Sequence, residues 1–187
     1  MRLFAAVLPP AEALGELRTA LAALPADEGL RWTAEAGRHF TLAFMGEVRD
    51  EVLPDLHARL GRAASRTAPF PLRLRGAGHF GARSLWVGAA GDLDALRMLA
   101  ERADAAARRA GVPMEGHHRY TPHVTLARTR TGAHADLTPY LDGLAAFEGA
   151  RWRAERLSLV RSNLPTSGIP GERPRYETVA DWPLTGR

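Results

Sequence analysis

Two short stretches of the sequence are nearly the same: HFTLAF at residues 39–44 and HVTLAR at residues 123–128. Both contain His, Thr, Leu and Ala in the same order. They differ at the sixth position, where Phe44 stands in the first and Arg128 in the second. A short motif that occurs twice in one chain points to an internal repeat, provided that its surroundings repeat as well.

The surroundings of the two motifs do repeat. The first motif follows an apolar strand pattern that opens at Leu3, a helical pattern and a connection. The second follows a strand pattern that opens near Leu85, another helical pattern and a connection of similar length. Because the motifs occupy matching places in two similar units, we expect them to face each other across a cleft, related by an approximate two-fold axis.

The order of strand and helix patterns bears on the fold class. Strands are predicted at residues 2–9, 38–48, 69–81, 84–91, 123–128, 152–162 and 175–184, and helices at 11–24, 50–64, 92–110 and 137–144. Strand–helix alternation alone is typical of a parallel α/β sheet. The long connections and the paired closing strands instead favour an α+β fold, with two antiparallel-rich sheets and outer helices around a central cleft. We expect residues 1–187 to form a single domain of two pseudo-symmetric lobes.

Composition narrows the class of protein further. The chain has 187 residues, is 45% hydrophobic and contains no Cys, which excludes disulfides, thiolate metal sites and a Cys nucleophile. No apolar run approaches the ~20 residues that span a bilayer, and the opening MRLFAAV reads as a strand, so we expect a cytoplasmic protein without a membrane partner. All 25 basic residues are Arg and the net charge is +4. This charge fits either a genomic codon bias or a surface that attracts phosphate or RNA.

The repeated motif places two kinds of polar side chain together. Since alternate residues of a strand point to one face, His39 projects with Thr41, and His123 projects with Thr125. Two facing units supply two imidazoles, one of which can act as a base and the other as an acid, and two hydroxyls that can donate to oxyanions. This set suits displacement at phosphorus, in which a proton leaves the nucleophile and another reaches the leaving group.

A metal site is the alternative reading of the two histidines. Zinc takes three or four protein ligands, and no Cys or nearby carboxylate completes the set here. The adjacent pair His117 and His118 is a second candidate, but neighbouring side chains diverge and a solvated loop is the better interpretation. We therefore expect neither a metal nor a cofactor.

At the level of whole motifs, the chain resembles the 2H phosphoesterases, and within them the bacterial RNA 2′,3′-cyclic phosphodiesterases, which are also called 2′-5′ RNA ligases. The resemblance spans MRLFAAV, HFTLAFMGEV, PFPLRLRGAGHF, RSLWVG, YTPHVTLAR and the ending LSLVRSNL…RYETVADWPL. It implies metal-independent hydrolysis of a ribose 2′,3′-cyclic phosphate to a 2′-phosphomonoester, and the reverse joining of RNA ends through a 2′-5′ linkage. The implied partners are RNA ends or nucleotides bearing the cyclic phosphate, tRNA halves among them, and we expect a monomer.

The same resemblance implies a role for each motif residue. His123 is the proton acceptor that activates water, and His39 is the proton donor to the departing 3′-oxygen. Thr41 and Thr125 hold the non-bridging phosphate oxygens. Which histidine is the acid and which the base rests on the resemblance alone.

The sixth positions and one neighbour are candidate substrate-binding residues. Phe44 and Arg128 could sandwich a nucleobase, with weak base specificity because every base has a π face, or Arg128 could clamp the phosphate. In a regular strand the sixth residue points away from the first, so reaching the cleft requires twist, a bulge or the strand end. Tyr120, just before the second motif, either lines the pocket or packs in the core.

Two other functions remain open. The same fold could act on an ADP-ribose cyclic phosphate or on 2′-5′ oligonucleotides. A different class of protein, an RNA-end-binding module without turnover, has no need for a matched acid and base, and the intact motifs argue against it.

Overall fold

The computed structural model describes residues 1–116 and 119–187. His117 and His118 lie outside the described residues, so the interpretation of that pair stays a prediction. The described part of the chain contains nine strands and four α-helices, and the fold is α+β, as predicted. The strands are β1 (Arg2–Val7), β2 (Leu30–Trp32), β3 (Phe40–Glu47), β4 (Phe70–Phe80), β5 (Ser84–Gly91), β6 (Val124–Thr129), β7 (Trp152–Ala154), β8 (Arg156–Asn163) and β9 (Arg175–Pro183). The helices are α1 (Ala11–Ala22), α2 (Leu53–Ser65), α3 (Leu93–Arg109) and α4 (Thr138–Leu144), with short 3-10 turns at Glu35–Gly37 and Asp50–Val52.

The two halves of the sheet have equivalent strand arrangements. It runs β7-β4-β5-β6-β3-β1-β8-β9, with β2 added beside β6, and every described pairing is antiparallel. Each half therefore places a motif strand, β6 or β3, at the centre and the opening strand of its repeat, β5 or β1, next to it. This is the two-fold arrangement that the repeated sequence predicts.

The two predicted sheets are joined into one sheet at the centre. The link between β3 and β6 is the single antiparallel pair of Phe40 with Val124. Both side chains are fully buried. Antiparallel pairing at this point brings His39 beside Thr125, and His123 beside Thr41. The approximate two-fold axis thus passes between the two motifs.

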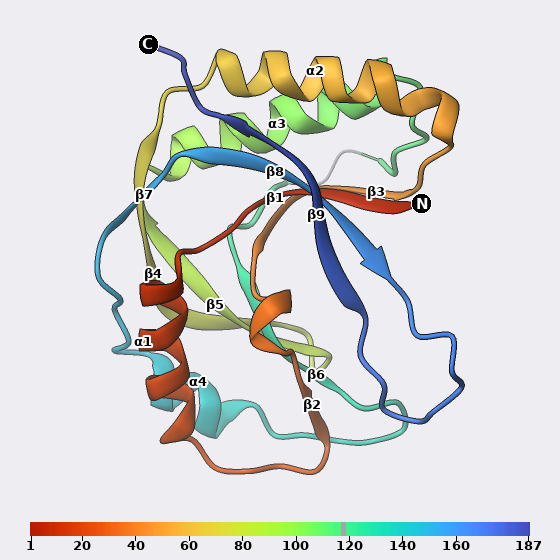
Figure 1. Ribbon diagram of the computed structural model, residues 1–187. Helices are drawn as coiled ribbons and strands as arrows, with labels where there is room; N and C mark the ends of the chain where they lie inside the picture. Colours follow the sequence, from red (N-terminus) through yellow and green to blue (C-terminus); the bar gives the residue numbers. More distant parts are fainter. Residues whose placement is uncertain (117–118) are drawn as a thin grey trace.

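Two of the helices pack on the lobe opposite to the strand that precedes them. Helix α1 follows β1 but contacts β4, and α3 follows β5 but contacts β3. Helices α2 and α3 lie side by side at the top of Figure 1, and α1 and α4 lie at the lower left. Because each repeat places one helix on the other lobe, the lobes share one hydrophobic core.

The closing segment differs from the sequence-based expectation. Residues 152–162 were expected to form one strand, but Glu155 divides them into β7 and β8. Strand β7 pairs with β4 of one lobe, whereas β8 pairs with β1 of the other. The alternation of apolar and polar residues shifts by one position at the division, where Glu155 and Arg156 are adjacent and both exposed. The sequence thus marks the break but not the change of partner. The short strand β2 lies in what was expected to be a connection, and it exists only because it pairs with β6.

Local signals account for several element boundaries. The backbone N–H of Ala95 donates to the Asp92 carboxylate at 3.0 Å, which caps α3 as its sequence predicts. Gly111, with a φ of 94°, takes the left-handed conformation just after α3.

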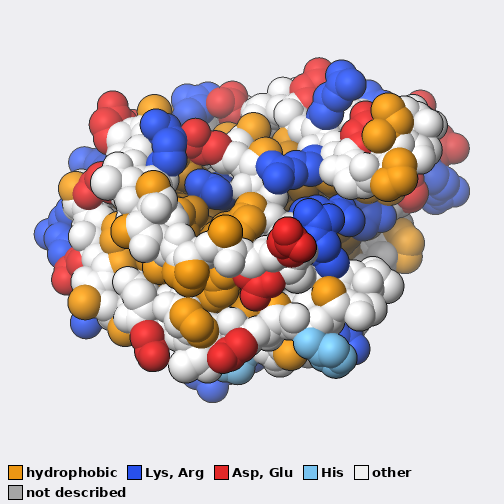
Figure 2. Space-filling model, turned by 90° about the horizontal axis from the view of Figure 1, so that it is seen from below, with side chains coloured by type: hydrophobic (Ala, Val, Ile, Leu, Met, Phe, Trp, Pro, Cys, Tyr) orange, Lys and Arg blue, Asp and Glu red, His pale blue; other side chains and the backbone are white. Residues whose placement is uncertain are grey.

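In the part of the chain that the structure describes, no helix is both long enough and apolar enough to cross a membrane. Figure 2 shows arginine side chains at several places on one face, beside a hydrophobic patch and interspersed with acidic side chains.

Candidate active site

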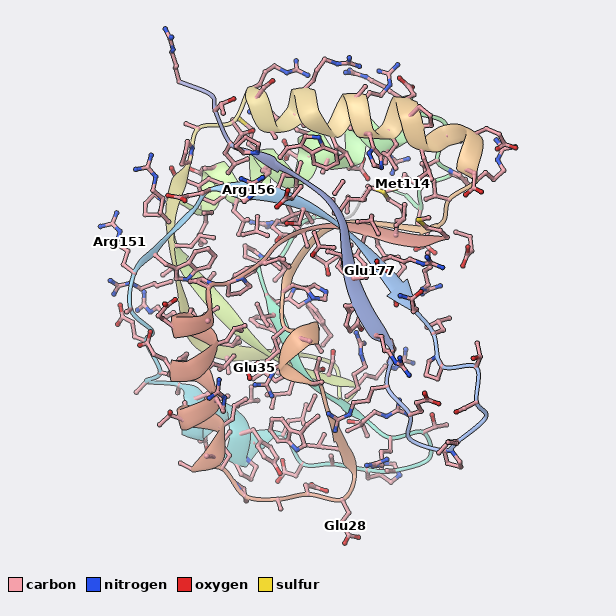
Figure 3. The ribbon with its side chains drawn as sticks, in the orientation of Figure 1. Glu28, Glu35, Met114, Arg151, Arg156 and Glu177 are labelled. Atoms are coloured by element: carbon pink, nitrogen blue, oxygen red, sulfur yellow. The ribbon has the colours of Figure 1, made fainter. Side chains whose placement is uncertain are left out.

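One cleft, with a volume of about 1290 Å³, contains every residue that the sequence singles out for catalysis or substrate binding. Its walls come from β3, from β6 and the segment before it, and from α3 and the segment after it; Met114, labelled in Figure 3, belongs to the last of these. The predicted residues that line it are His39, Thr41, Phe44, Tyr120, His123, Thr125 and Arg128. The two motifs therefore form one site.

A β-bulge in β3 explains how Phe44 reaches this cleft. The pairing of β3 with β1 passes from Thr41 directly to Ala43 and leaves Leu42 as the extra residue. A bulge shifts the alternation of side chains by one position. The sixth residue of the motif consequently returns to the face of the first and third.

The second motif carries the same bulge at the same letter. The pairing of β6 with β5 passes from Thr125 to Ala127 and leaves Leu126 as the extra residue. Arg128 thereby joins His123 on the cleft face. Of the three routes considered in the sequence analysis, the bulge is the one found in both strands, and the repeated Thr-Leu-Ala is the sequence that adopts it.

Aromatic rings surround His39. Its imidazole stacks on Phe4 with ring centres 4.6 Å apart and contacts the edge of Tyr176 at 5.3 Å. Tyr176 can approach because the neighbouring position is Gly37, where a Cβ would lie 2.8 Å from the Tyr176 ring. Burial among these groups lowers the pKa of His39 to about 4, so the free protein holds this side chain neutral at pH 7.

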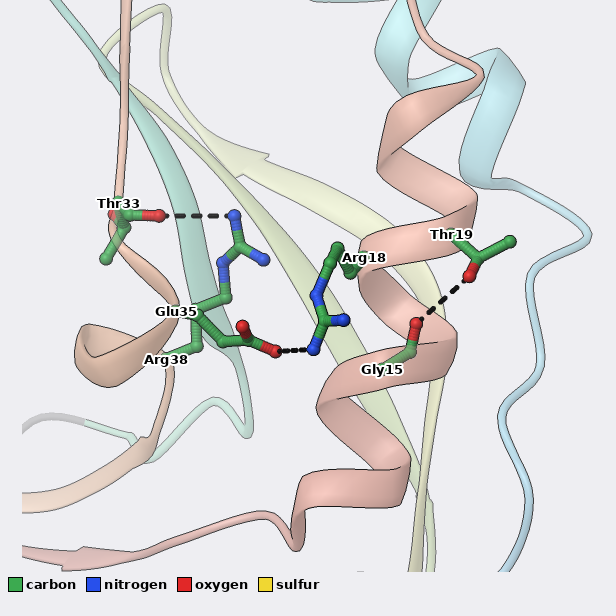
Figure 4. Close-up of polar contacts among 6 residues, drawn as sticks. All are labelled: Gly15, Arg18, Thr19, Thr33, Glu35 and Arg38. Atoms are coloured by element: carbon green, nitrogen blue, oxygen red, sulfur yellow. Dashed lines mark hydrogen bonds and ion pairs between the residues drawn. The ribbon is translucent and has the colours of Figure 1, made fainter.

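The turn that leads into β3 is held by polar contacts (Figure 4). Arg38 donates from its guanidinium to the carbonyl oxygen of Thr33 at 3.1 Å, and Arg18 on α1 donates to the Glu35 carboxylate at 2.7 Å. Thr33 itself lines the cleft. The Arg18–Glu35 pair is exposed and adds little stability, but it ties α1 to the segment that positions His39.

Among residues 1–116 and 119–187, the His123 ring has a hydrogen-bond partner and the His39 ring has none. Its Nδ1 lies 2.6 Å from the carbonyl oxygen of Thr121, which can only accept, so Nδ1 carries the proton and Nε2 keeps a lone pair. Burial lowers the pKa of His123, the bond to Thr121 raises it in part, and the nearby Arg128 guanidinium lowers it further. Below that pKa, Nε2 is protonated; above it, Nε2 is free to accept a proton.

Aromatic rings also enclose His123, in a way that mirrors His39. Phe80 meets its ring edge-on at 4.8 Å and Trp86 lies at 5.8 Å. The Trp86 indole covers Gly78, where a Cβ would lie 2.2 Å from the ring. Each histidine therefore has an aromatic neighbour whose position depends on a glycine.

The three candidate substrate-binding residues differ in their exposure. Phe44 is 53% exposed, with the Arg2 guanidinium 5.0 Å from its ring centre, and it lies parallel to Phe4. Arg128 is exposed. Tyr120 lines the cleft, but its hydroxyl is buried without a hydrogen-bond partner among the described residues, and burial raises the pKa of its phenol.

The sequence analysis missed the aromatic walls. One signal was present: the repeats open with Leu3-Phe4 and with Leu85-Trp86, so an aromatic residue stands at the same place in both. Tyr176 had no such signal, because it comes from a strand outside the repeat, and Phe80 lies at the end of β4. Within residues 1–116 and 119–187 there is no group of three or more His, Cys, Asp or Glu side chains that could hold a metal ion.

Comparison with known proteins adds the family. Residues 8–165 match the family model of the 2′-5′ RNA ligase superfamily. An RNA 2′,3′-cyclic phosphodiesterase of Thermus thermophilus is 34% identical over 194 residues, which cover 100% of this chain and 91% of the relative. The crystal structure of TT0787 from Thermus thermophilus has a TM-score of 0.77 at 31% identity and covers 100% of this chain and 99% of that one. Escherichia coli LigT complexed with 3′-AMP has a TM-score of 0.77 at 27% identity, covering 98% of this chain and 97% of that one. The chain belongs to the 2′-5′ RNA ligase superfamily of 2H phosphoesterases.

Proposed function

We propose that this protein hydrolyses the 2′,3′-cyclic phosphate of an RNA end or nucleotide to a 2′-phosphomonoester and a free 3′-hydroxyl. The observation that carries the proposal is the convergence of both His-x-Thr motifs in one cleft, on strands with matching bulges. A relative named as an RNA 2′,3′-cyclic phosphodiesterase supports the choice of substrate.

The proposed reaction is one displacement at phosphorus. His123 Nε2 accepts a proton from water as the water oxygen attacks the phosphorus. The bond from phosphorus to the 3′-oxygen breaks, and His39 gives a proton to that oxygen. The defined Nδ1 bond of His123 supports its role as the base, since it leaves Nε2 as the accepting nitrogen. Exchange of protons with solvent then restores both histidines.

The acid role of His39 depends on the bound substrate. With a pKa of about 4, the free imidazole is mostly neutral at pH 7 and has no proton to give from its second nitrogen. A phosphate anion beside His39 favours the charged imidazolium and raises this pKa. The bound substrate therefore promotes the protonation of His39, which supplies the proton that the leaving group needs. Thr41 and Thr125 donate hydrogen bonds to the non-bridging oxygens, which carry the charge in the transition state.

The base of the nucleotide is proposed to lie between Phe44 and Arg128. The exposure of both side chains in the cleft supports this place for it, and stacking predicts weak base specificity. We also propose that the protein works as a cytoplasmic monomer and as a single domain of two lobes, with tRNA halves among its substrates and with ligation as the reverse of the same reaction.

A product analysis tests the function. The protein is incubated in EDTA with an RNA that ends in a 2′,3′-cyclic phosphate, and the new end is identified by its mass and by co-elution with 2′-phosphate and 3′-phosphate standards. A 2′-phosphate is the expected product. A 3′-phosphate contradicts the mechanism, and binding without any product favours the non-catalytic module.

Single substitutions test the acid–base pair. His39→Gln and His123→Gln should each lower kcat by at least about a hundredfold, because each removes one proton transfer. His57→Gln is the matched control, since His57 lies on α2 against Trp182 and does not line the cleft. Equal activity of His57→Gln and His39→Gln would remove His39 from the mechanism.

A further inference from the structure

A second hollow lies between α2 and α3, outside the cleft described above. It has a volume of about 330 Å³. Its lining contains five arginines and a single acidic residue, Glu101. We call it the arginine groove; the arginines are Arg59, Arg62 and Arg66 of α2 with its C-cap, and Arg102 and Arg109 of α3.

Most of this charge is not neutralised within the protein. Across the described ranges, Arg62, Arg66 and Arg109 are exposed and form no ion pair with a carboxylate. Arg102 is held in place, because its guanidinium donates to the carbonyl oxygen of Arg66 and to the Thr67 hydroxyl, both at 2.8 Å. These bonds leave its charge unpaired while they orient it.

The fifth arginine of the groove is partly neutralised. Arg59 donates to the Asp55 carboxylate at 2.7 Å, in an exposed pair one helical turn apart. Among the described residues, the groove therefore offers four unpaired cations against one lining carboxylate. A ligand with several negative charges in a row complements this arrangement.

The arginine groove and the cleft border the same helix. Glu101 and Ala105 of α3 line both hollows. On the cleft side, Arg108 is held by the Asp104 carboxylate at 2.7 Å. A chain that leaves the cleft across α3 passes Glu101 and Ala105 and reaches the groove on the same helix.

We propose that the arginine groove binds the sugar–phosphate backbone of single-stranded RNA whose 3′ end occupies the cleft. The inference rests on the proposed function, and it adds to it a second contact site, outside the catalytic cleft, for the body of an RNA substrate. A cyclic phosphate closes the 3′ end, so the RNA can leave the cleft only through its 5′ side, where each nucleotide adds one phosphate charge. Backbone contacts of this kind bind without reading sequence.

RNA fits the groove better than an acidic peptide does. An acidic peptide would also complement four arginines, but it would not require a groove that borders the same helix as a cleft proposed to bind a phosphate. The RNA proposal accounts for both the charge and its place. The peptide remains as an outcome of the test.

Direct binding tests the groove apart from catalysis. A fluorescent RNA of about 12 nucleotides with an ordinary 3′-hydroxyl is titrated by anisotropy at several salt concentrations. The double variant Arg62→Gln with Arg66→Gln should bind about tenfold more weakly than wild type, and its slope of log affinity against log salt should be shallower by about 1.4, for two lost phosphate contacts. The matched control is Arg151→Gln with Arg153→Gln, two exposed arginines that line neither hollow; Arg151 points outward in Figure 3.

A kinetic arm links the groove to the cleft. The groove variant should keep wild-type kcat/KM on a 2′,3′-cyclic mononucleotide and lose about tenfold on a cyclic-phosphate RNA of about 12 nucleotides, through KM. Equal effects on the two substrates, no effect on RNA binding, or the same loss in the control variant would each overturn the proposal. So would a polyglutamate peptide that binds wild type and not the groove variant while RNA binds both alike.

The two proposals fail in different ways. If wild type does not hydrolyse the cyclic mononucleotide, the proposed function is wrong, and the anisotropy result still shows whether the groove holds RNA. If hydrolysis proceeds but the variant binds RNA as wild type does, only the groove proposal is wrong.

Discussion

Replacing His39 by Gln removes the most strongly shifted histidine of the cleft and should change how folding depends on pH. In the folded protein burial brings the pKa of His39 from 6.5 to about 4. Between these values the unfolded chain binds a proton on this side chain and the folded protein does not. Acidification therefore favours the unfolded state, and the contribution of neutral His39 is fully present above pH 6.5 and is lost as the pH falls toward 4.

The size of the effect follows from the difference between the two pKa values. A pKa difference of one corresponds to about 1.36 kcal/mol, so at pH 4 the loss amounts to about 3 kcal/mol. Other groups also titrate in this range, but most of them are common to wild type and variant. The free energy of unfolding of wild type, less that of His39→Gln, should therefore fall by about 3 kcal/mol between about pH 7 and pH 4.

Urea unfolding at a series of pH values, followed by circular dichroism, measures this difference, and an NMR titration of the imidazole gives the pKa directly. Parallel pH profiles for wild type and His39→Gln would refute the argument that burial by Phe4 and Tyr176 keeps the side chain neutral. The pKa of His39 can also be measured with an anion bound in the cleft. Inorganic phosphate in the cleft should raise the pKa of His39. An NMR pKa that stays at about 4 with phosphate bound would contradict the proposed acid role.

Three further substitutions probe other parts of the cleft. Gly78→Ala places a Cβ 2.2 Å from the Trp86 ring, so Trp86 must move; we expect a loss of about 1–3 kcal/mol in urea unfolding, and a change in tryptophan fluorescence together with lower activity. Arg128→Ala should lower kcat/KM on a cyclic mononucleotide at least about tenfold, whereas the exposed Arg151→Ala should not, and equal values would exclude a contact of Arg128 with substrate. Thr125→Val keeps the shape of the side chain and removes its hydroxyl; kcat should fall by about a hundredfold with little change in KM, and a loss confined to KM would mean that the hydroxyl serves ground-state binding only.

The repeat made much of the fold predictable. Matching strand and helix patterns around the two motifs predict a two-fold arrangement, and the strand order of the sheet has it. The pairing partner of each strand was harder to predict from the sequence. Residues 152–162 read as one strand, yet they divide at Glu155 between the two lobes, because the choice of partner depends on sheet edges built from distant parts of the chain.

For the site, the sequence by itself determined the chemical groups: two imidazoles and two hydroxyls at alternate positions of two strands, with Phe44 and Arg128 as the asymmetric pair. Local alternation is enough to predict which side chains share a face. Only the tertiary structure decided how the asymmetric pair reaches that face, because a bulge is defined by the pairing with a neighbouring strand. Only the tertiary structure, likewise, decided the protonation of the histidines. Their pKa values depend on burial by aromatic rings from strands far away in the sequence, and that burial exists only when the two lobes pack around the cleft.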